Sequence, residues 1–138
     1  MTVRSFRGEA LDSPDAPGSY DVAYCLSVVE HIPTAVQRRR MMTGVHRLLR
    51  RGGLFVLTID LALTLYPFTT TPGAPELQNV AIDELLSFAD FSLVFGNPSE
   101  LIGMPGFDPA VILRRAAAGD FLLDGNGLTS QCLVLQAR

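Results

Sequence analysis

Short apolar runs along the chain alternate with segments in which apolar residues recur every three or four positions. The runs at residues 20–26, 54–59, 91–95 and 130–136 are bounded by glycine or polar residues, which is the pattern of strands. Residues 20–26 (YDVAYCL) are almost continuously apolar, so we expect a strand that is buried on both faces of a sheet. Val3 to Phe6 is a further, shorter strand candidate.

The clearest helix of the pattern follows the strand at 20–26. Thr34 and Gln37 have the spacing of a capping box, which satisfies free amides at the start of a helix. The apolar positions that then recur on one face are Met41, Met42, Val45, Leu48 and Leu49. Gly52 and Gly53 are expected to end this helix, and the arginine run at 38–40 is interpreted as a solvated helix face.

The order of elements predicts the topology. A strand, a helix and a strand joined by short connections form a right-handed crossover with a parallel pair. Further helices are predicted at residues 80–89 and 109–118, the second with Asp108 as its N-cap. The run at 130–136 follows a turn at 124–127 and is expected to return antiparallel. The pattern therefore predicts an α/β fold, mostly parallel with an antiparallel last strand.

Composition narrows the class of protein. Of the 138 residues, 48% are hydrophobic and 18% are charged, which is typical of one soluble domain. Fourteen acidic residues stand against eleven basic ones, all arginine, and the net charge of −3 lacks the positive footprint of a nucleic-acid-binding protein. No apolar segment approaches the roughly 20 residues of a membrane-spanning helix.

Cysteine usage and the first residues bear on the compartment. Cys25 and Cys132 lie far apart within apolar runs, so we interpret both as buried, reduced thiols and expect no metal site. The opening residues, MTVRSFRGEA, contain no basic stretch followed by an apolar run, so we expect no targeting segment. These features favour a cytoplasmic protein without a membrane or nucleic-acid partner.

Two segments carry a family resemblance. Residues 18–31 (GSYDVAYCLSVVEH) and 48–60 (LLRRGGLFVLTID), separated by one helix, resemble the central part of class I S-adenosylmethionine-dependent methyltransferases. The resemblance implies a Rossmann-like, seven-stranded sheet, S-adenosylmethionine as cofactor, and transfer of its methyl group to an unidentified small-molecule acceptor. In that sheet the fourth, fifth, sixth and antiparallel seventh strands would be residues 20–26, 54–59, 91–95 and 130–136.

The resemblance also implies that part of the domain is absent. The first strand of the family and its glycine-rich cofactor turn would precede residue 1. The only Gly-x-Gly of the chain, Gly125 to Gly127, leads into a strand rather than a helix, so we interpret it as a hairpin turn. Residues 1–138 are therefore expected to form a single partial methyltransferase domain, truncated at its N-terminus.

Cofactor-binding residues follow from the resemblance one position at a time. Glu9 and Ala10 stand where the family usually has Asp-Ala, whose carboxylate accepts a hydrogen bond from the adenine amine, and Asp12 is a competing candidate. Three residues at the end of the first long strand would form the floor of the pocket: Cys25, Leu26 and Ser27. Residues beyond the next strand are candidates for the wall of the acceptor site: Asp60, Tyr66 and Phe68.

Glu30 and His31 suggest an acid–base pair, because histidine titrates near neutrality. Adjacent residues do not face each other in a helix or a strand, however. The resemblance assigns this pair mainly to the shape of the turn, so His31 is only a weak catalytic candidate.

Two functions remain open. The chain is either a methyltransferase or a non-catalytic, truncated domain that pairs with another chain. In both cases the strand at 20–26 would have an open apolar edge and one uncovered face, so we expect a homo-oligomer or a complementing chain at that edge.

Overall fold

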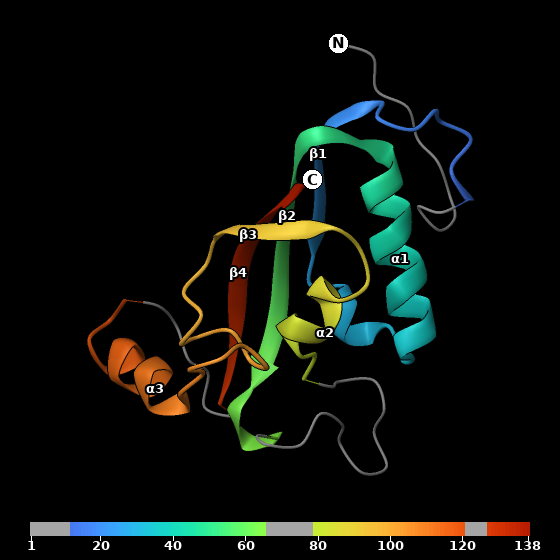
Figure 1. Ribbon diagram of the computed structural model, residues 1–138. Helices are drawn as coiled ribbons and strands as arrows, with labels where there is room; N and C mark the ends of the chain where they lie inside the picture. Colours follow the sequence, from blue (N-terminus) through green and yellow to red (C-terminus); the bar gives the residue numbers. More distant parts are fainter. Residues whose placement is uncertain (1–11, 66–78, 121–126) are drawn as a thin grey trace.

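Four strands form one sheet in the computed structural model, which describes residues 12–65, 79–120 and 127–138 (Figure 1). The strands are β1 (Tyr20–Leu26), β2 (Leu49–Ala62), β3 (Phe91–Phe95) and β4 (Leu128–Ala137), in the spatial order β1-β2-β4-β3. β1 runs parallel to β2, whereas β4 lies antiparallel to both β2 and β3. The predicted α/β fold with an antiparallel last strand is confirmed.

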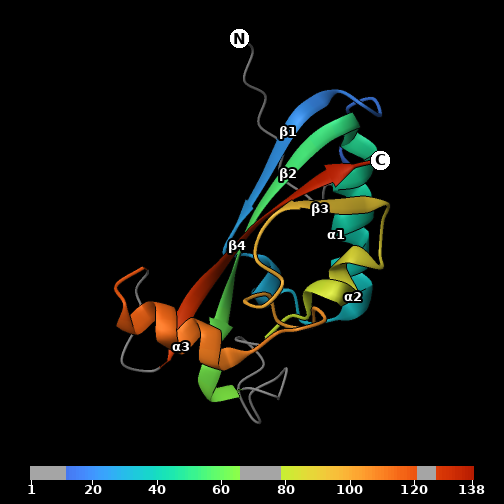
Figure 2. The same ribbon diagram turned by 60° about the vertical axis from the view of Figure 1, so that its left-hand side comes forward.

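The helices are α1 (Ala35–Leu48), α2 (Ile82–Leu86) and α3 (Pro109–Ala117), with short 3₁₀ turns at Val29–His31 and Leu63–Leu65. α1 and α2 lie on the same side of the sheet in two views of the molecule (Figures 1 and 2). Their buried side chains pack with the apolar residues of β2 and β4 in the main core. α3 lies at the end of the sheet where β2 finishes, and its Ile112 packs with Leu61 and Ile102.

Alternation along β2 explains why only one face of the sheet is covered. Phe55, Leu57 and Ile59 are fully buried beneath α1 and α2, while the residues between them are partly exposed. On β1 the same alternation leaves Tyr24 69% and Leu26 56% exposed. The prediction that residues 20–26 are buried on both faces is therefore wrong for the described chain, in which β1 pairs only with β2 and nothing covers its second face.

The helix at 35–48 begins as predicted and ends earlier. The Thr34 hydroxyl accepts a hydrogen bond from the amide of Gln37 at 3.3 Å, as an N-cap does. The helix ends at Leu48, and the chain enters β2 directly, so the prediction that Gly52 and Gly53 end it is wrong.

The two glycines instead serve a bulge in β2. Tyr20 pairs with Leu49 and Val22 with Leu54, so residues 50–53 form extra chain on the β2 side. Gly52 has a φ of +79°, and a Cβ atom on Gly53 would lie 2.9 Å from the carbonyl oxygen of Arg50. The bulge therefore requires a left-handed conformation and a close backbone approach, which glycine permits.

The remaining boundaries also differ from the predictions. The helix expected at 80–89 spans only Ile82–Leu86, and the one expected at 109–118 ends at Ala117, with Asp108 as its N-cap. The strand at 91–95 is confirmed, whereas β2 and β4 extend beyond the predicted runs because their antiparallel ladder continues to Ala62 paired with Leu128. Val3 to Phe6 and residues 124–126 lie outside the described residues.

The arginine run is a solvated face only in part, because Arg39 and Arg40 are exposed, as predicted, whereas Arg38 is buried. Arg38 is only 9% exposed and donates to the Glu84 carboxylate on α2 and to the carbonyl of Ile32. The Arg39 guanidinium lies 5.1 Å from the centre of the Phe88 ring. Glu84 and Phe88 are distant in sequence from the arginine run, so the local pattern does not show these contacts. The contact with Glu84 makes Arg38 part of the packing between α1 and α2.

The two cysteines differ in their exposure to solvent. Both are free thiols, and Cys25 is half-buried, whereas Cys132 is exposed on β4, so its predicted burial is wrong. The reason is that Cys132 occupies the face of the sheet that the described helices leave open. Burial, and to a smaller extent the Glu30 carboxylate, raises the pKa of Cys25 from 9.0 to about 11.

Candidate functional site

The turn that follows β1 defines one edge of the candidate site. Ser27 adopts a φ of +49°, which is uncommon for a residue other than glycine, and its amide donates to the carbonyl of Thr58 at 2.9 Å and to the Thr58 hydroxyl at 3.1 Å. These bonds hold the turn against β2. Leu26 and Val28 on either side of Ser27 are 56% and 48% exposed, so the turn presents an apolar surface.

A polar bridge crosses the same edge of the sheet. The Asp60 carboxylate accepts a hydrogen bond from the Ser130 hydroxyl at 2.7 Å and a longer one from the Ser27 hydroxyl at 3.5 Å. Asp60 and Ser130 are register partners in β2 and β4. Asp60 therefore lies within β2 rather than beyond its end, and its side chain connects β2 with β4 and with the turn after β1.

Glu30 lies beneath this bridge. Its side chain is fully buried, and one carboxylate oxygen accepts a hydrogen bond from the amide of Asp60 at 3.2 Å. The other oxygen is buried and has no hydrogen-bond partner among the described residues. Burial raises the pKa of this carboxyl group above its ordinary value. The adjacent His31 is exposed, so the structure gives the two residues different environments, and a catalytic role of His31 stays a prediction.

The structure therefore brings together part of the predicted site. Leu26, Ser27 and Asp60 lie together at one edge of the sheet. The Cys25 side chain packs against the covered core, so only the backbone of Cys25 is available to the site. The competing candidate Asp12 forms an exposed ion pair with Arg40. The other predicted residues lie outside the described residues: Glu9, Ala10, Tyr66 and Phe68.

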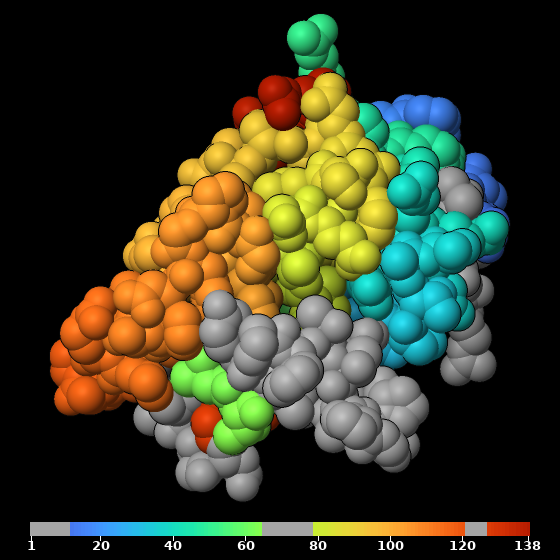
Figure 3. Space-filling model, turned by 60° about the horizontal axis from the view of Figure 1, so that its bottom comes forward, coloured from blue at the N-terminus to red at the C-terminus, as the bar shows by residue number. Residues whose placement is uncertain are grey.

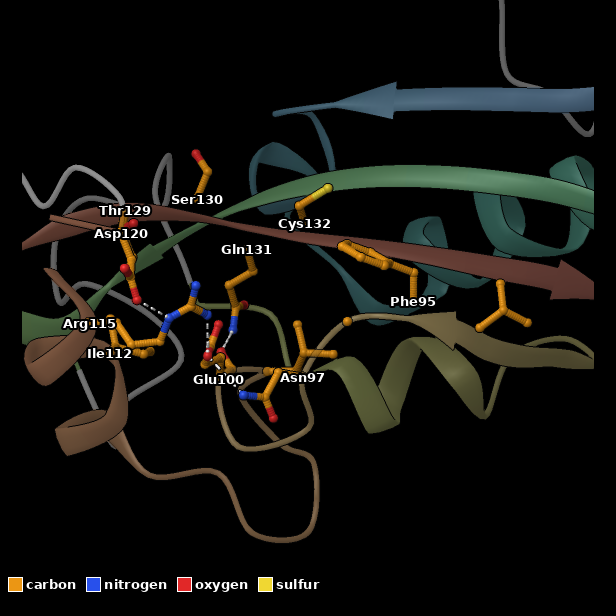
Figure 4. Close-up of a pocket in the computed structure, with 13 residues that line it drawn as sticks. Phe95, Asn97, Glu100, Ile112, Arg115, Asp120, Thr129, Ser130, Gln131 and Cys132 are labelled. Carbon is orange, nitrogen blue, oxygen red and sulfur yellow. Dashed lines mark hydrogen bonds and ion pairs between the residues drawn. The ribbon is translucent and has the colours of Figure 1, made fainter. Parts of the chain in front are cut away.

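A pocket that the sequence did not predict lies beside the bridge. It has a volume of about 580 Å³ and lies between the end of β3, the first part of β4 and α3 (Figure 4). Arg115 of α3 donates to Glu100 and, at 2.9 Å, to Asp120, and the amide of Asn97 donates to Glu100 at 2.8 Å. Ser130 is among the lining residues, and its side chain donates to Asp60 from the side of β4 opposite to Gln131 (Figure 4), so the pocket and the edge are neighbours along β4.

The position of this pocket agrees with a general rule for open α/β sheets. Ligands bind beyond the carboxyl ends of parallel strands, and β3 runs parallel to β1 and β2 because both β2 and β3 are antiparallel to β4. The predicted site residues follow only the strands at 20–26 and 54–59, whereas this pocket lies beyond the end of the strand at 91–95. Figure 3 views the molecule from this end, where α3 lies next to the last residues of β2.

Two negative findings apply to the described ranges. Within residues 12–65, 79–120 and 127–138, no group of three or more His, Cys, Asp or Glu side chains is placed to hold a metal ion. In the same ranges, no helix is both long and apolar enough to cross a membrane.

Comparison with known proteins gives both a sequence and a structural match. Residues 2–57 match the family model of the methyltransferase domain. No curated protein sequence matches the chain. The match to the family model confirms the resemblance predicted from residues 18–31 and 48–60.

Solved structures share the fold at low sequence identity. A geranyl diphosphate C-methyltransferase from Streptomyces coelicolor A3(2), solved with Mg²⁺, geranyl diphosphate and S-adenosylhomocysteine, matches 98% of this chain and 54% of its own at 9% identity, with a TM-score of 0.61. An S-adenosylmethionine-dependent methyltransferase from Methanosarcina mazei matches 94% and 64%, at 16% identity and a TM-score of 0.58. The [4+2]-cyclase SpnF matches 94% and 54%, at 14% identity and a TM-score of 0.59. The chain thus spans about half to two thirds of the length of these proteins.

Proposed function

We propose, from the premise that the chain carries a methyltransferase domain of the class I S-adenosylmethionine-dependent family, that it takes part in methyl transfer from this cofactor to a small-molecule acceptor. The observation that carries the proposal is the apolar turn after β1, which the bonds from Ser27 to Thr58 hold at the carboxyl edge of the sheet. This turn belongs to the segment that matches the family model.

The residues at this edge fit one wall of a cofactor site. Leu26 and Val28 offer exposed apolar surface on which the non-polar parts of the cofactor would pack. Asp60 places a carboxylate behind that surface, and negative charge suits a ligand whose reactive centre is a sulfonium cation. Glu9 and Ala10 remain proposed contacts for the adenine end.

The chemistry expected of this edge is mainly positioning. When bound, the cofactor supplies an electrophilic methyl group on a sulfonium sulfur. The Asp60 carboxylate accepts hydrogen bonds from the hydroxyls of Ser130 and Ser27, so it connects β2 with β4 and with the turn after β1. A rigid edge of this kind favours methyl transfer by keeping donor and acceptor within reach and in line, so few acid–base residues are needed. Tyr66 and Phe68 stay proposed residues of the acceptor wall.

The small-molecule acceptor is supported by the neighbours, one of which was solved with geranyl diphosphate. The fold by itself does not determine the reaction, because another neighbour is a [4+2]-cyclase. The proposal therefore depends on cofactor binding by this chain, which is directly measurable.

The uncovered face of β1 supports a partner. Tyr24 and Val22 are 69% and 36% exposed on a strand that pairs only with β2 in the described chain. Exposed apolar surface on an open strand edge favours association. We propose that a second copy or a complementing chain covers this face, and sedimentation velocity at two protein concentrations tests it. A single monomeric species at both concentrations would contradict association of copies.

Calorimetric titration with S-adenosylhomocysteine tests the proposed function. We expect binding in the micromolar range for the wild-type chain and clearly weaker binding for Leu26→Asp, which puts a charge into the apolar wall. Val36→Asp is the control for a charge placed on an exposed apolar position, because Val36 is 70% exposed on α1 and is not one of the residues proposed for the cofactor wall. Equal binding by both variants would place the cofactor elsewhere. Absence of binding at millimolar ligand, by a folded wild-type chain, would favour the non-catalytic alternative.

A further inference from the structure

The pocket beside β4 exists because β3 is shorter than its neighbour. Phe95, the last residue of β3, pairs with Val134, so residues 128–133 of β4 extend beyond the β3 ladder. The segment after β3 and α3 approach this part of β4 without pairing with it, and a space of about 580 Å³ remains between them (Figure 4). Pockets that hold small molecules have volumes of about 300–1,000 Å³.

Gln131 indicates which kind of group a ligand of this pocket would carry. Its side chain lines the pocket and the residue is only 6% exposed. The amide nitrogen donates to the carbonyl of Glu100, which fixes the orientation of the amide group. The amide oxygen is then a buried acceptor with no hydrogen-bond partner among the described residues. Buried acceptors are satisfied in nearly all proteins, so this oxygen indicates a ligand with an N–H or O–H donor.

The charged side chains of the pocket indicate which charge such a ligand would carry. Two carboxylates, Glu100 and Asp120, line it together with one guanidinium, Arg115, to which both are paired. The described lining residues therefore carry one net negative charge, which favours a cationic ligand and disfavours an anionic one. Apolar surface is present at the same place, since Phe95 is 62% and Val94 51% exposed.

We propose that this pocket binds a small molecule with an apolar body and a primary amine, whose N–H donates to the Gln131 amide oxygen. The identification of this molecule as the methyl acceptor rests on the function proposed above. This identification is supported by the position of the pocket at the same end of the sheet, because Ser130, the residue before Gln131 on β4, donates to Asp60 at the edge assigned to the cofactor.

Two probes of the same size test the proposal. Phenethylamine and phenylacetate share a phenyl group and differ in the sign of their charge. In ¹⁵N-edited NMR titrations we expect phenethylamine to bind and to shift the side-chain amide signals of Gln131, and phenylacetate to bind at least about tenfold more weakly.

Variants on β4 provide the control. Gln131→Met removes the acceptor at similar volume, and we expect it to weaken phenethylamine binding about tenfold. Gln136→Met is matched, because Gln136 is also on β4, donates its side-chain amide to the carbonyl of Gly52 at 3.3 Å and does not line the pocket, so it should leave binding unchanged. Equal binding of both probes, or shifts remote from Gln131, would overturn the proposal, and because these readings use the wild-type chain they stand even if Gln131→Met does not fold.

Separate titration with S-adenosylhomocysteine distinguishes the two proposals. Amine binding without binding of S-adenosylhomocysteine would support the pocket and refute its role in methyl transfer. Binding of S-adenosylhomocysteine without the amine would refute the amine pocket and leave the proposed function intact.

Discussion

Replacement of Glu84 by glutamine tests the ion pair between α1 and α2. The Nε and Nη2 atoms of Arg38 both donate to the same Glu84 carboxylate oxygen, at 3.1 and 3.0 Å. The Arg38 side chain is 10% exposed and that of Glu84 34%. Glutamine keeps the shape and an acceptor but removes the negative charge, which leaves a largely buried guanidinium without its counter-ion.

The magnitude follows from distance and exposure. Two unit charges about 4 Å apart attract each other by about 4 kcal/mol at an effective dielectric constant of about 20. Solvent reaches about a third of Glu84, which screens part of this attraction. We therefore expect Glu84→Gln to lower the free energy of unfolding by about 2 kcal/mol, between the values typical of exposed and of buried pairs.

Urea unfolding at pH 7 measures this loss, with Asp21→Asn as the control. Asp21 pairs with Arg50, and the two side chains are 77% and 57% exposed, so its replacement should cost less than about 1 kcal/mol. The reasoning is refuted if Glu84→Gln costs no more than Asp21→Asn. Combining Glu84→Gln with Arg38→Met should recover part of the loss, because the unpaired buried charge is then gone.

Three further predictions concern other positions. Cys25, with its pKa raised to about 11, should react with iodoacetamide at pH 8 much more slowly than the exposed Cys132, and similar rates in peptide mass spectra would contradict this. The raised pKa of Glu30 means that the folded state binds this proton more tightly than the unfolded state; its contribution to stability is complete below the ordinary value of 4.5 and declines as pH rises through the raised pKa. Urea unfolding from pH 4 to 8 should show this decline, and Glu30→Gln should reduce it; an unchanged pH profile would refute the assignment. Thr34→Ala should lower the unfolding free energy by about 1 kcal/mol by removing the N-cap of α1, whereas no change in the urea midpoint would show that the cap contributes nothing.

Local patterns were sufficient for most elements because their causes are local. The Thr34 cap depends on an amide three residues away, and the strand at 91–95 on its own apolar run, so both were predicted. The end of α1 was not, because glycines stop helices in general, whereas Gly52 and Gly53 serve a bulge that depends on the pairing of β2 with β1. Arg38 was misinterpreted for the same reason, since Glu84 lies far away in sequence.

The sequence by itself determined the α/β class, the order of elements, the family resemblance and the position of Leu26 and Ser27 at the end of β1. Hydrophobic periodicity and motif spacing act over a few residues and are therefore visible in the chain. Tertiary structure alone decided the buried Glu30 beneath Asp60, the bond from Ser130 to Asp60 and the pocket around Gln131. These features depend on strand register and on how far β4 extends beyond β3, and register joins residues that are distant in sequence.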